Sequence, residues 1–213
     1  MGKPAGLAEE QDRALGRLSR IPATKDLYLA GGSAVAFHLR HRRSNDLDLF
    51  SSSGAVDLAE LRERILDAAK DVEVISATDV CLRLLIESVP VDIVRYRYPP
   101  LEVPQPGPHG VLVAGRKDLA TMKLAAIGGR GLRRDFWDLY EILRGGLSIE
   151  EAAAAYLARF GLHESDLYHL ARALTYFVDA ETDPMFPLGL SVKKWKQIKA
   201  FFKEEAPHLL AAP

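Results

Sequence analysis

The spacing of hydrophobic residues changes near residue 115, and this change constrains the possible folds more than any other feature of the sequence. Upstream of it, short runs of β character alternate with segments of helical spacing, whereas every segment downstream has helical spacing. Five prolines and two glycines lie within residues 99–110, just before the change. Because proline lacks an amide donor and restricts φ, we expect a loop without regular elements there.

This pattern predicts an α+β chain with a domain boundary near residue 115. The β-rich domain covers 1–115 and the all-α domain covers 116–213. The expected strands cover 26–30, 46–50, 72–76, 80–88, 91–96 and 111–114. The expected helices cover 7–20, 33–40, 57–70, 117–128, 133–144, 148–160, 164–179 and 191–205. Ser33 is expected to cap the second helix, and Pro90 separates two strands that we expect to form a hairpin.

Composition and charge exclude several classes of protein. Hydrophobic residues make up 48% of the 213 residues, which excludes disorder over most of the chain. The net charge of −1 means that any affinity for nucleic acid must come from a local patch. The single cysteine, Cys81, excludes an internal disulfide and a Cys-rich zinc site. Without a secretion signal or an apolar run of about 18 residues, the protein is expected to be cytoplasmic, with no membrane partner.

Three aspartates indicate a metal site. Asp46 and Asp48 lie two apart on one expected strand, so they share a face with α-carbons about 6.6–6.8 Å apart. Asp92 interrupts an apolar strand, where a charged group is costly to bury unless it is paired or bound to a metal. If the two strands are neighbours, the three carboxylates converge as a two-metal phosphoryl-transfer site requires. The alternative is an ordinary exposed strand face, on which a D-x-D pattern is common.

A Gly-Gly-Ser turn precedes these carboxylates. Gly31, Gly32 and Ser33 join a strand to the start of a helix, where backbone N–H groups and the helix dipole favour an anion. Glycine also allows the backbone to approach a triphosphate closely. The combination of this turn with R-x-S-x-D-L-D a dozen residues later is much more specific than either pattern alone.

The residues from about 26 to 144 resemble the AbiEii-type nucleotidyltransferases, a branch of the DNA polymerase β-like superfamily. The resemblance rests on GGSAVAFHLRHRRSNDLDLF (31–50), VDIV (91–94) and KDLATMKLAAIGGRGLRRDFWDLYEIL (117–143). It implies a small mixed sheet with flanking helices, followed by a helical domain that closes the cleft. It also implies an NTP substrate, Mg²⁺ or Mn²⁺, and an acceptor that is RNA, such as the 3′ end of tRNA, or a protein. Family members include toxins, which implies a separate antitoxin partner.

The resemblance also implies roles for individual residues. Asp46, Asp48 and Asp92 match metal-binding carboxylates, and the third often assists the incoming hydroxyl in the wider superfamily. The nucleotide-binding positions are Gly31, Gly32, Ser33, Arg43, Ser44 and Lys123. Lys123 matches a triphosphate ligand, and Asp135 or Asp138 acts as a further catalytic residue in RDFWDLY.

Other interpretations of these residues remain open. Lys123 lies in an apolar stretch and can also extend its ammonium to the surface. Asp135 can be a helix cap or an ordinary ion-pair partner. The aromatic residues of RDFWDLY are expected to form core contacts between the two domains. The lysines of 192–203 can bind RNA, although a solvated helix face is the favoured interpretation.

We also keep two alternatives for the function. The same scaffold can transfer a phosphoryl group, acting as a kinase. A non-catalytic module that binds a nucleotide or a partner is less consistent with the carboxylates, because such a module has no need of two like charges on one face.

Overall fold

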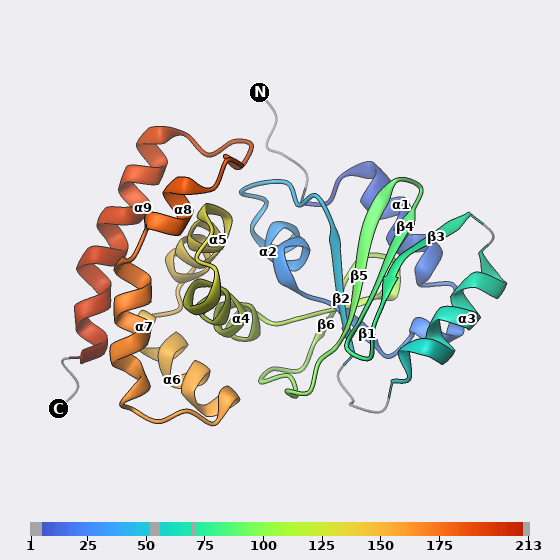
Figure 1. Ribbon diagram of the computed structural model, residues 1–213, viewed down its shortest axis with the longest axis horizontal. Coiled ribbons are helices and arrows are strands. Elements are labelled where there is room, and N and C mark those ends of the chain that lie inside the picture. The colour runs from blue at the N-terminus through green and yellow to red at the C-terminus, as the bar shows by residue number, and fades with distance from the viewer. Residues whose placement is uncertain (1–5, 52–55, 70, 211–213) are drawn as a thin grey trace. The chain divides into compact units, whose positions relative to one another are not determined.

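The computed structural model describes residues 6–51, 56–69 and 71–210, and the chain divides into two compact units, Met1–Gly115 and Arg116–Pro213 (Figure 1). The first unit contains the sheet and the second contains helices. The predicted fold class, a mixed sheet with flanking helices followed by an all-α part, is confirmed. Among the described residues, no helix is both long enough and apolar enough to cross a membrane.

A seven-stranded mixed sheet organises the first unit. Its order is β3-β4-β5-β2-β1-β7-β6. The strands are β1 (Leu27–Leu29), β2 (Leu47–Ser51), β3 (Val72–Ala77), β4 (Cys81–Ile86), β5 (Val89–Arg95), β6 (Gln105–Pro106) and β7 (Leu112–Val113). The pairs β2–β5 and β1–β7 are parallel and the other pairs are antiparallel. The parallel β2–β5 pair brings two strands together that are far apart in the sequence.

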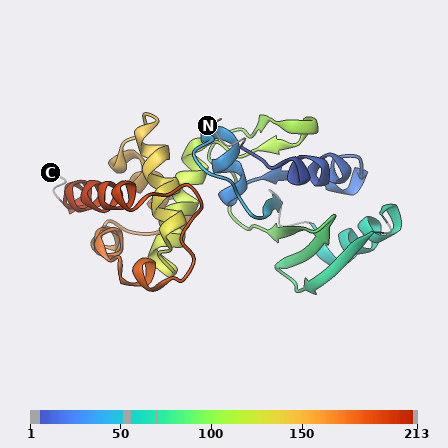
Figure 2. The same cartoon turned by 90° about the horizontal axis from the view of Figure 1, so that it is seen from above.

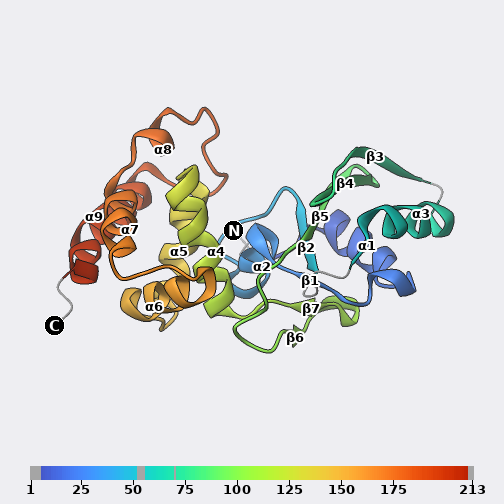
Figure 3. The ribbon, with the colours of Figure 1, turned by 60° about the horizontal axis from the view of Figure 1, so that its bottom comes forward.

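Alternating residues of the central strands form the core of this unit. Leu47, Leu49, Val91 and Ile93 are 2% exposed or less, and the residues between them point to the other face of the sheet. The apolar face is covered by α1 (Glu9–Leu18) and α3 (Leu58–Ala68), which Figure 3 shows on one side of β3, β4 and β5. Figure 2 shows α3 beside the outer strands β3 and β4. The opposite face is therefore the one on which polar residues can gather.

The second unit is a helical cluster with an aromatic core. Its helices are α4 (Arg116–Gly129), α5 (Arg133–Arg144), α6 (Ile149–Phe160), α7 (Asp166–Thr175), α8 (Val178–Thr182) and α9 (Val192–Glu205). Helix α4 packs against α5, α6 and α7, and α9 packs against α5 and α7. The ring of Phe136 contacts those of Phe177, Trp195 and Phe202, with centroids 5.1, 6.0 and 5.5 Å away. Phe136 thus belongs to the core of this unit itself.

Several local predictions need correction. Helix α2 (Gly31–Leu39) begins two residues before Ser33, so Ser33 lies inside its first turn and is not its cap. The predicted hairpin is confirmed, but its turn is formed by Glu87 and Ser88, which have φ of 50° and 67°, and Pro90 lies within β5. The positions of Ser33 and Pro90 differ from the prediction because a purely local pattern is equally consistent with the neighbouring position for each residue.

Two longer segments also differ from the prediction. Residues 99–110 contain regular elements after all, the short strand β6 and a 3₁₀ turn at Pro108–Gly110. The helix expected at 164–179 is interrupted, because α7 ends at Thr175 and α8 begins at Val178. Helical spacing continues across this interruption, so the pattern alone could not locate it.

Candidate active site

The three predicted metal-binding carboxylates lie on and beside two neighbouring strands. Asp48 lies on β2 and Asp46 directly precedes it. In the parallel β2–β5 pair, Asp48 is in register with Asp92. Because paired residues of adjacent strands point to the same face about 4.8 Å apart, Asp48 and Asp92 are side by side on the face opposite the apolar core. Such neighbouring anions require a compensating charge.

The glycine turn at the start of α2 holds one of these carboxylates. The backbone N–H of Gly32 donates to Oδ2 of Asp48 at 3.0 Å. Gly31 has φ of 55°, and a Cβ on it would lie 2.3 Å from the same oxygen. Only glycine satisfies both the left-handed backbone and this close approach. Glycine at position 31 is therefore a requirement of the position of Asp48.

Two serines connect the turn to the carboxylate strand. The Ser33 hydroxyl accepts a hydrogen bond from the Asp48 amide and donates one to the Ala30 carbonyl, both at 3.1 Å. The Ser44 hydroxyl donates to Oδ1 of Asp46 at 3.0 Å. The predicted residues Ser33 and Ser44 thus orient the carboxylate strand from two sides in this structure.

Among the basic residues before β2, Arg42 lies against the turn. Arg42 is 6% exposed, and its guanidinium would be 2.8 Å from a Cβ built on Gly32. The neighbouring Arg43, which the resemblance favoured, is exposed and contributes its carbonyl as an acceptor for Arg42 at 2.8 Å. A role for the Arg43 side chain stays a prediction, while the sequence analysis missed the buried position of Arg42.

Arg83 is a second residue that the sequence analysis missed. It lies on β4 opposite Asp92 and donates to both carboxylate oxygens, each at 2.7 Å. This bidentate ion pair raises the pKa of Arg83 above its ordinary value, because its effect exceeds the lowering that burial causes. Cys81, two residues earlier, has its thiol pKa raised by burial and by the Asp92 charge. The positive charge beside the carboxylates therefore comes from the strand next to them.

The remaining predicted residues, Lys123, Asp135 and Asp138, lie together in the second unit. The Lys123 ammonium is 3.1 Å from Asp135 and 2.8 Å from Asp138, and both carboxylates are fully buried. Because the Lys123 side chain is 6% exposed, it does not extend to the surface. Burial raises the pKa of Asp135, but Lys123 and Arg130 outweigh this effect and lower it overall. A triphosphate-binding role for Lys123 and a catalytic role for either aspartate stay predictions.

The carboxylates of the first unit are suited to a hard divalent cation. Carboxylate oxygens are the donors that Mg²⁺ prefers, and Gly31 leaves the space that a larger residue would take from Asp48. Across residues 6–51, 56–69 and 71–210, no group of three His, Cys, Asp or Glu side chains is arranged to hold one metal ion. Asp92 in particular directs both oxygens to Arg83. The carboxylate oxygens therefore suit a divalent metal ion, and one of the donors, Asp92, is bound by the guanidinium of Arg83.

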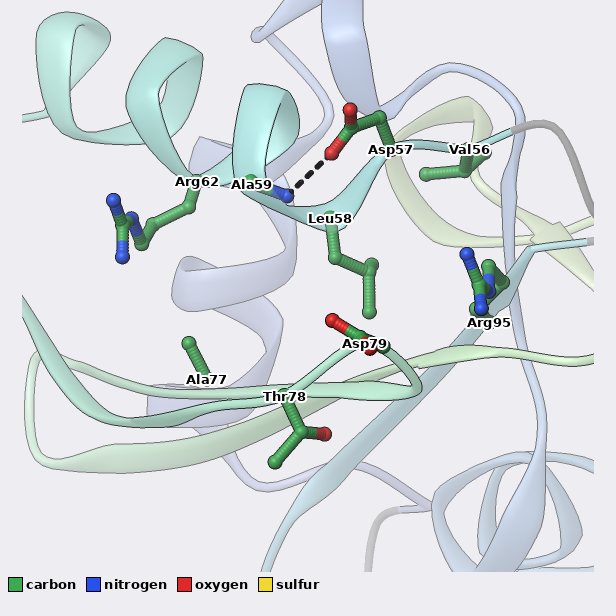
Figure 4. Close-up of a pocket in the computed structure, with 9 residues that line it drawn as sticks. All are labelled: Val56, Asp57, Leu58, Ala59, Arg62, Ala77, Thr78, Asp79 and Arg95. Atoms are coloured by element: carbon green, nitrogen blue, oxygen red, sulfur yellow. Dashed lines mark hydrogen bonds between the residues drawn. The ribbon is translucent and has the colours of Figure 1, made fainter.

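A separate pocket of about 480 Å³ lies between the start of α3 and the β3–β4 turn (Figure 4). Asp57 caps α3 from one wall, accepting from the Ala59 amide at 2.8 Å. Arg95 lines the pocket three residues beyond Asp92 on β5, where side chains point to the opposite face of the sheet. None of the predicted site residues lines this pocket.

Two of the three comparisons with known proteins cover almost the whole chain. Residues 13–212 match the family described as nucleotidyl transferase AbiEii toxin, type IV TA system. An uncharacterized protein of Aquifex aeolicus (strain VF5) is 30% identical over 206 residues, which cover 96% of this chain and 98% of that protein. The solution structure of the antibiotic-resistance factor ANT(2'')-Ia is similar with a TM-score of 0.50 and 15% identity, covering 71% of this chain and 91% of that one. At this identity, the structural similarity concerns the fold alone.

Proposed function

The chain belongs to the AbiEii family of nucleotidyl transferase toxins of type IV toxin–antitoxin systems and is a nucleotidyltransferase, and from this premise we propose that it transfers NMP from an NTP to a hydroxyl of RNA or protein. The 3′ end of tRNA is the proposed RNA acceptor, and a separate antitoxin is the proposed partner. The observation that carries this proposal is the register of Asp48 with Asp92 beside the Gly31–Gly32 turn.

The proposed reaction is a displacement at the α-phosphorus of the NTP. The acceptor oxygen forms a bond to this phosphorus, the bond to the bridging oxygen of the β-phosphate breaks, and pyrophosphate leaves with the electron pair. Asp92 is proposed to take the hydroxyl proton. Bound Mg²⁺ or Mn²⁺ would supply charge neutralisation at the phosphate oxygens, and Asp46, Asp48 and Asp92 are the residues proposed to hold it.

The chain's own residues supply binding and orientation. The first turn of a helix leaves amides without an intrahelical acceptor, which makes the N-terminus of α2 favourable for a phosphate, although the Gly32 amide already donates to Asp48. The Ser33 and Ser44 hydroxyls keep the carboxylate strand in place before substrate binds. Such fixed charges and dipoles account for most of the rate in phosphoryl-transfer enzymes.

Substitution of Asp48 tests the proposal. We expect Asp48→Asn to lower label transfer from α-labelled NTPs by at least about 100-fold, because it removes a charge that the transition state needs. Each of the four NTPs is incubated with Mg²⁺ or Mn²⁺ and either total tRNA or cellular protein, and the product is sized and weighed by mass spectrometry. Asp71→Asn, an exposed aspartate of the same unit paired with Arg17, is the matched control and should retain activity.

The mass of the product separates the competing functions. Addition of NMP supports the proposal, whereas addition of phosphate alone would show a kinase. Equal label transfer by the wild type and Asp48→Asn would contradict catalysis at this site.

A further inference from the structure

The ion pair between Arg83 and Asp92 lies within the proposed metal site. The two residues are direct neighbours in the antiparallel β4–β5 pair, and the guanidinium donates through Nε and Nη2 to the two carboxylate oxygens. The side chain of Asp92 is 17% exposed and that of Arg83 is 52% exposed. The carboxylate is therefore mostly enclosed, while the cation that binds it can move into solvent.

The charge of a second carboxylate, that of Asp46, also acts on Arg83. Asp46 contributes to the raised pKa of Arg83, in addition to the larger effect of Asp92. The guanidinium thus offsets the negative charge of Asp92 and, to a smaller extent, that of Asp46. This is the electrostatic task that a divalent cation performs in the proposed reaction.

Arg83 and a metal ion cannot both use the same lone pairs of the Asp92 oxygens. A bidentate guanidinium lies in the carboxylate plane and engages the lone pairs that face it. A cation that binds Asp92 there must displace at least one of these hydrogen bonds. Because the Arg83 side chain is 52% exposed, its charge can be taken up by solvent when the ion pair is displaced.

We infer that Arg83 is a positioning residue that holds Asp92 in the metal-free protein and competes with the divalent cation for this carboxylate. The inference rests on the proposed function, because it takes the Asp46, Asp48 and Asp92 group as the metal site. It assigns a part in setting the metal affinity to β4, which lies outside the three motifs on which the resemblance rests. Arg83 is exchanged for the cation, and its long side chain moves toward solvent when the cation binds.

Binding of Mn²⁺ alone tests this inference without catalysis. The full chain, free of nucleotide, is titrated with Mn²⁺, and the electron paramagnetic resonance signal of the free ion gives the dissociation constant. We expect Arg83→Gln to tighten binding about three- to tenfold, because it removes both the competitor and a positive charge. Arg83→Lys keeps the charge but loses the bidentate geometry, so it should lie between the wild type and Arg83→Gln.

Two further variants isolate the mechanism. Arg64 pairs with Glu60 within α3 of the same unit, so Arg64→Gln should leave the Mn²⁺ affinity unchanged. If Arg83 acts through Asp92, the double variant Arg83→Gln with Asp92→Asn should bind Mn²⁺ at most about twofold more tightly than Asp92→Asn alone. Far-UV circular dichroism and thermal unfolding confirm that each variant is folded.

The outcomes separate this inference from the proposed function. Weakened Mn²⁺ binding in Asp48→Asn, together with unchanged or weaker binding in Arg83→Gln and Arg83→Lys, would overturn the role of Arg83 and leave the metal site standing. Wild-type Mn²⁺ affinity in Asp48→Asn would instead overturn the metal site, and with it the inference.

Discussion

Single contacts determine where the carboxylate of Asp48 can lie. It depends on a glycine amide, on a serine hydroxyl that binds its backbone, and on the lack of a side chain at Gly31. None of these contacts requires a large buried area, yet each restricts where the carboxylate of Asp48 can lie. The site is therefore more sensitive to small substitutions than its exposure suggests.

Gly31→Ala is expected to impair the site strongly. The new Cβ would lie 2.3 Å from Oδ2 of Asp48, and alanine at φ of 55° costs a further ~1–2 kcal/mol. Displacement of the carboxylate by about 1 Å should reduce NMP transfer by about 100-fold. Steady-state kinetics measures the change. Gly128→Ala is the control, since a Cβ there meets nothing within 4 Å, and it should leave the activity unchanged.

The buried charges of the second unit contribute to its stability. Asp135 is fully buried and pairs with Lys123 at 3.1 Å and with Arg130 at 3.1 Å. Removal of one partner from such a group leaves a buried charge without compensation. Because Lys123 keeps Asp138 as a partner at 2.8 Å, we expect Asp135→Asn to lower the free energy of unfolding by about 1–3 kcal/mol near neutral pH.

This effect should depend on pH in a defined direction. The pKa of Asp135 is lowered in the folded protein, so its ion pair stabilises the fold above the ordinary carboxyl pKa and is lost as the pH falls through the folded value. Urea unfolding of the wild type and Asp135→Asn at several pH values should therefore show a difference that shrinks toward strongly acidic pH. A difference that grows on acidification would contradict this assignment.

Among the secondary-structure elements, the β4–β5 hairpin determines which side chain lies opposite Asp92. Once the turn is placed at Glu87 and Ser88, the antiparallel register follows, and it sets Arg83 opposite Asp92. A turn placed at Pro90 gives a different register, which is why the sequence analysis did not find this ion pair. The alternation of apolar residues predicted both strands, but not the pairing between them.

The same turn offers a stability prediction. Ser88 has φ of 67°, a conformation that glycine adopts without steric cost. Ser88→Gly should raise the free energy of unfolding by about 0.5–1 kcal/mol, because the relief of steric cost exceeds the added entropy of the unfolded chain. Ser88→Val should lower it, since β-branched side chains tolerate this region poorly. Thermal unfolding gives the stability of both variants. Equal unfolding midpoints for Ser88→Gly and Ser88→Val would argue against a strained turn.

The whole molecule consists of two units that each contain a buried core. In the first, apolar residues alternate along the central strands, and in the second, aromatic rings gather around Phe136. The aromatic residues of RDFWDLY had been expected to form contacts between domains, but Phe136 packs on rings of its own unit. Each unit thus has the apolar interior that an independent domain requires.

We expect residues 116–213 to fold without the first unit. The isolated fragment should show a helical far-UV circular dichroism spectrum and a cooperative thermal transition, because its core and its buried Lys123–Asp135 pair are internal. The intact chain is the reference. A fragment with little helix, or one that melts without cooperativity, would show that its core depends on the first unit.

Local patterns in the sequence were enough to predict the fold class, most strands and helices, and the acidic and glycine motifs of the site. Periodicity is encoded by residues a few positions apart, and the motifs are contiguous, so neither needs knowledge of long-range packing. The tertiary structure alone revealed that Arg83 binds Asp92, that Arg42 lies against Gly32, and that Lys123 is enclosed by two aspartates. These contacts depend on strand register and helix packing, which join residues whose spacing along the chain carries no signal of its own.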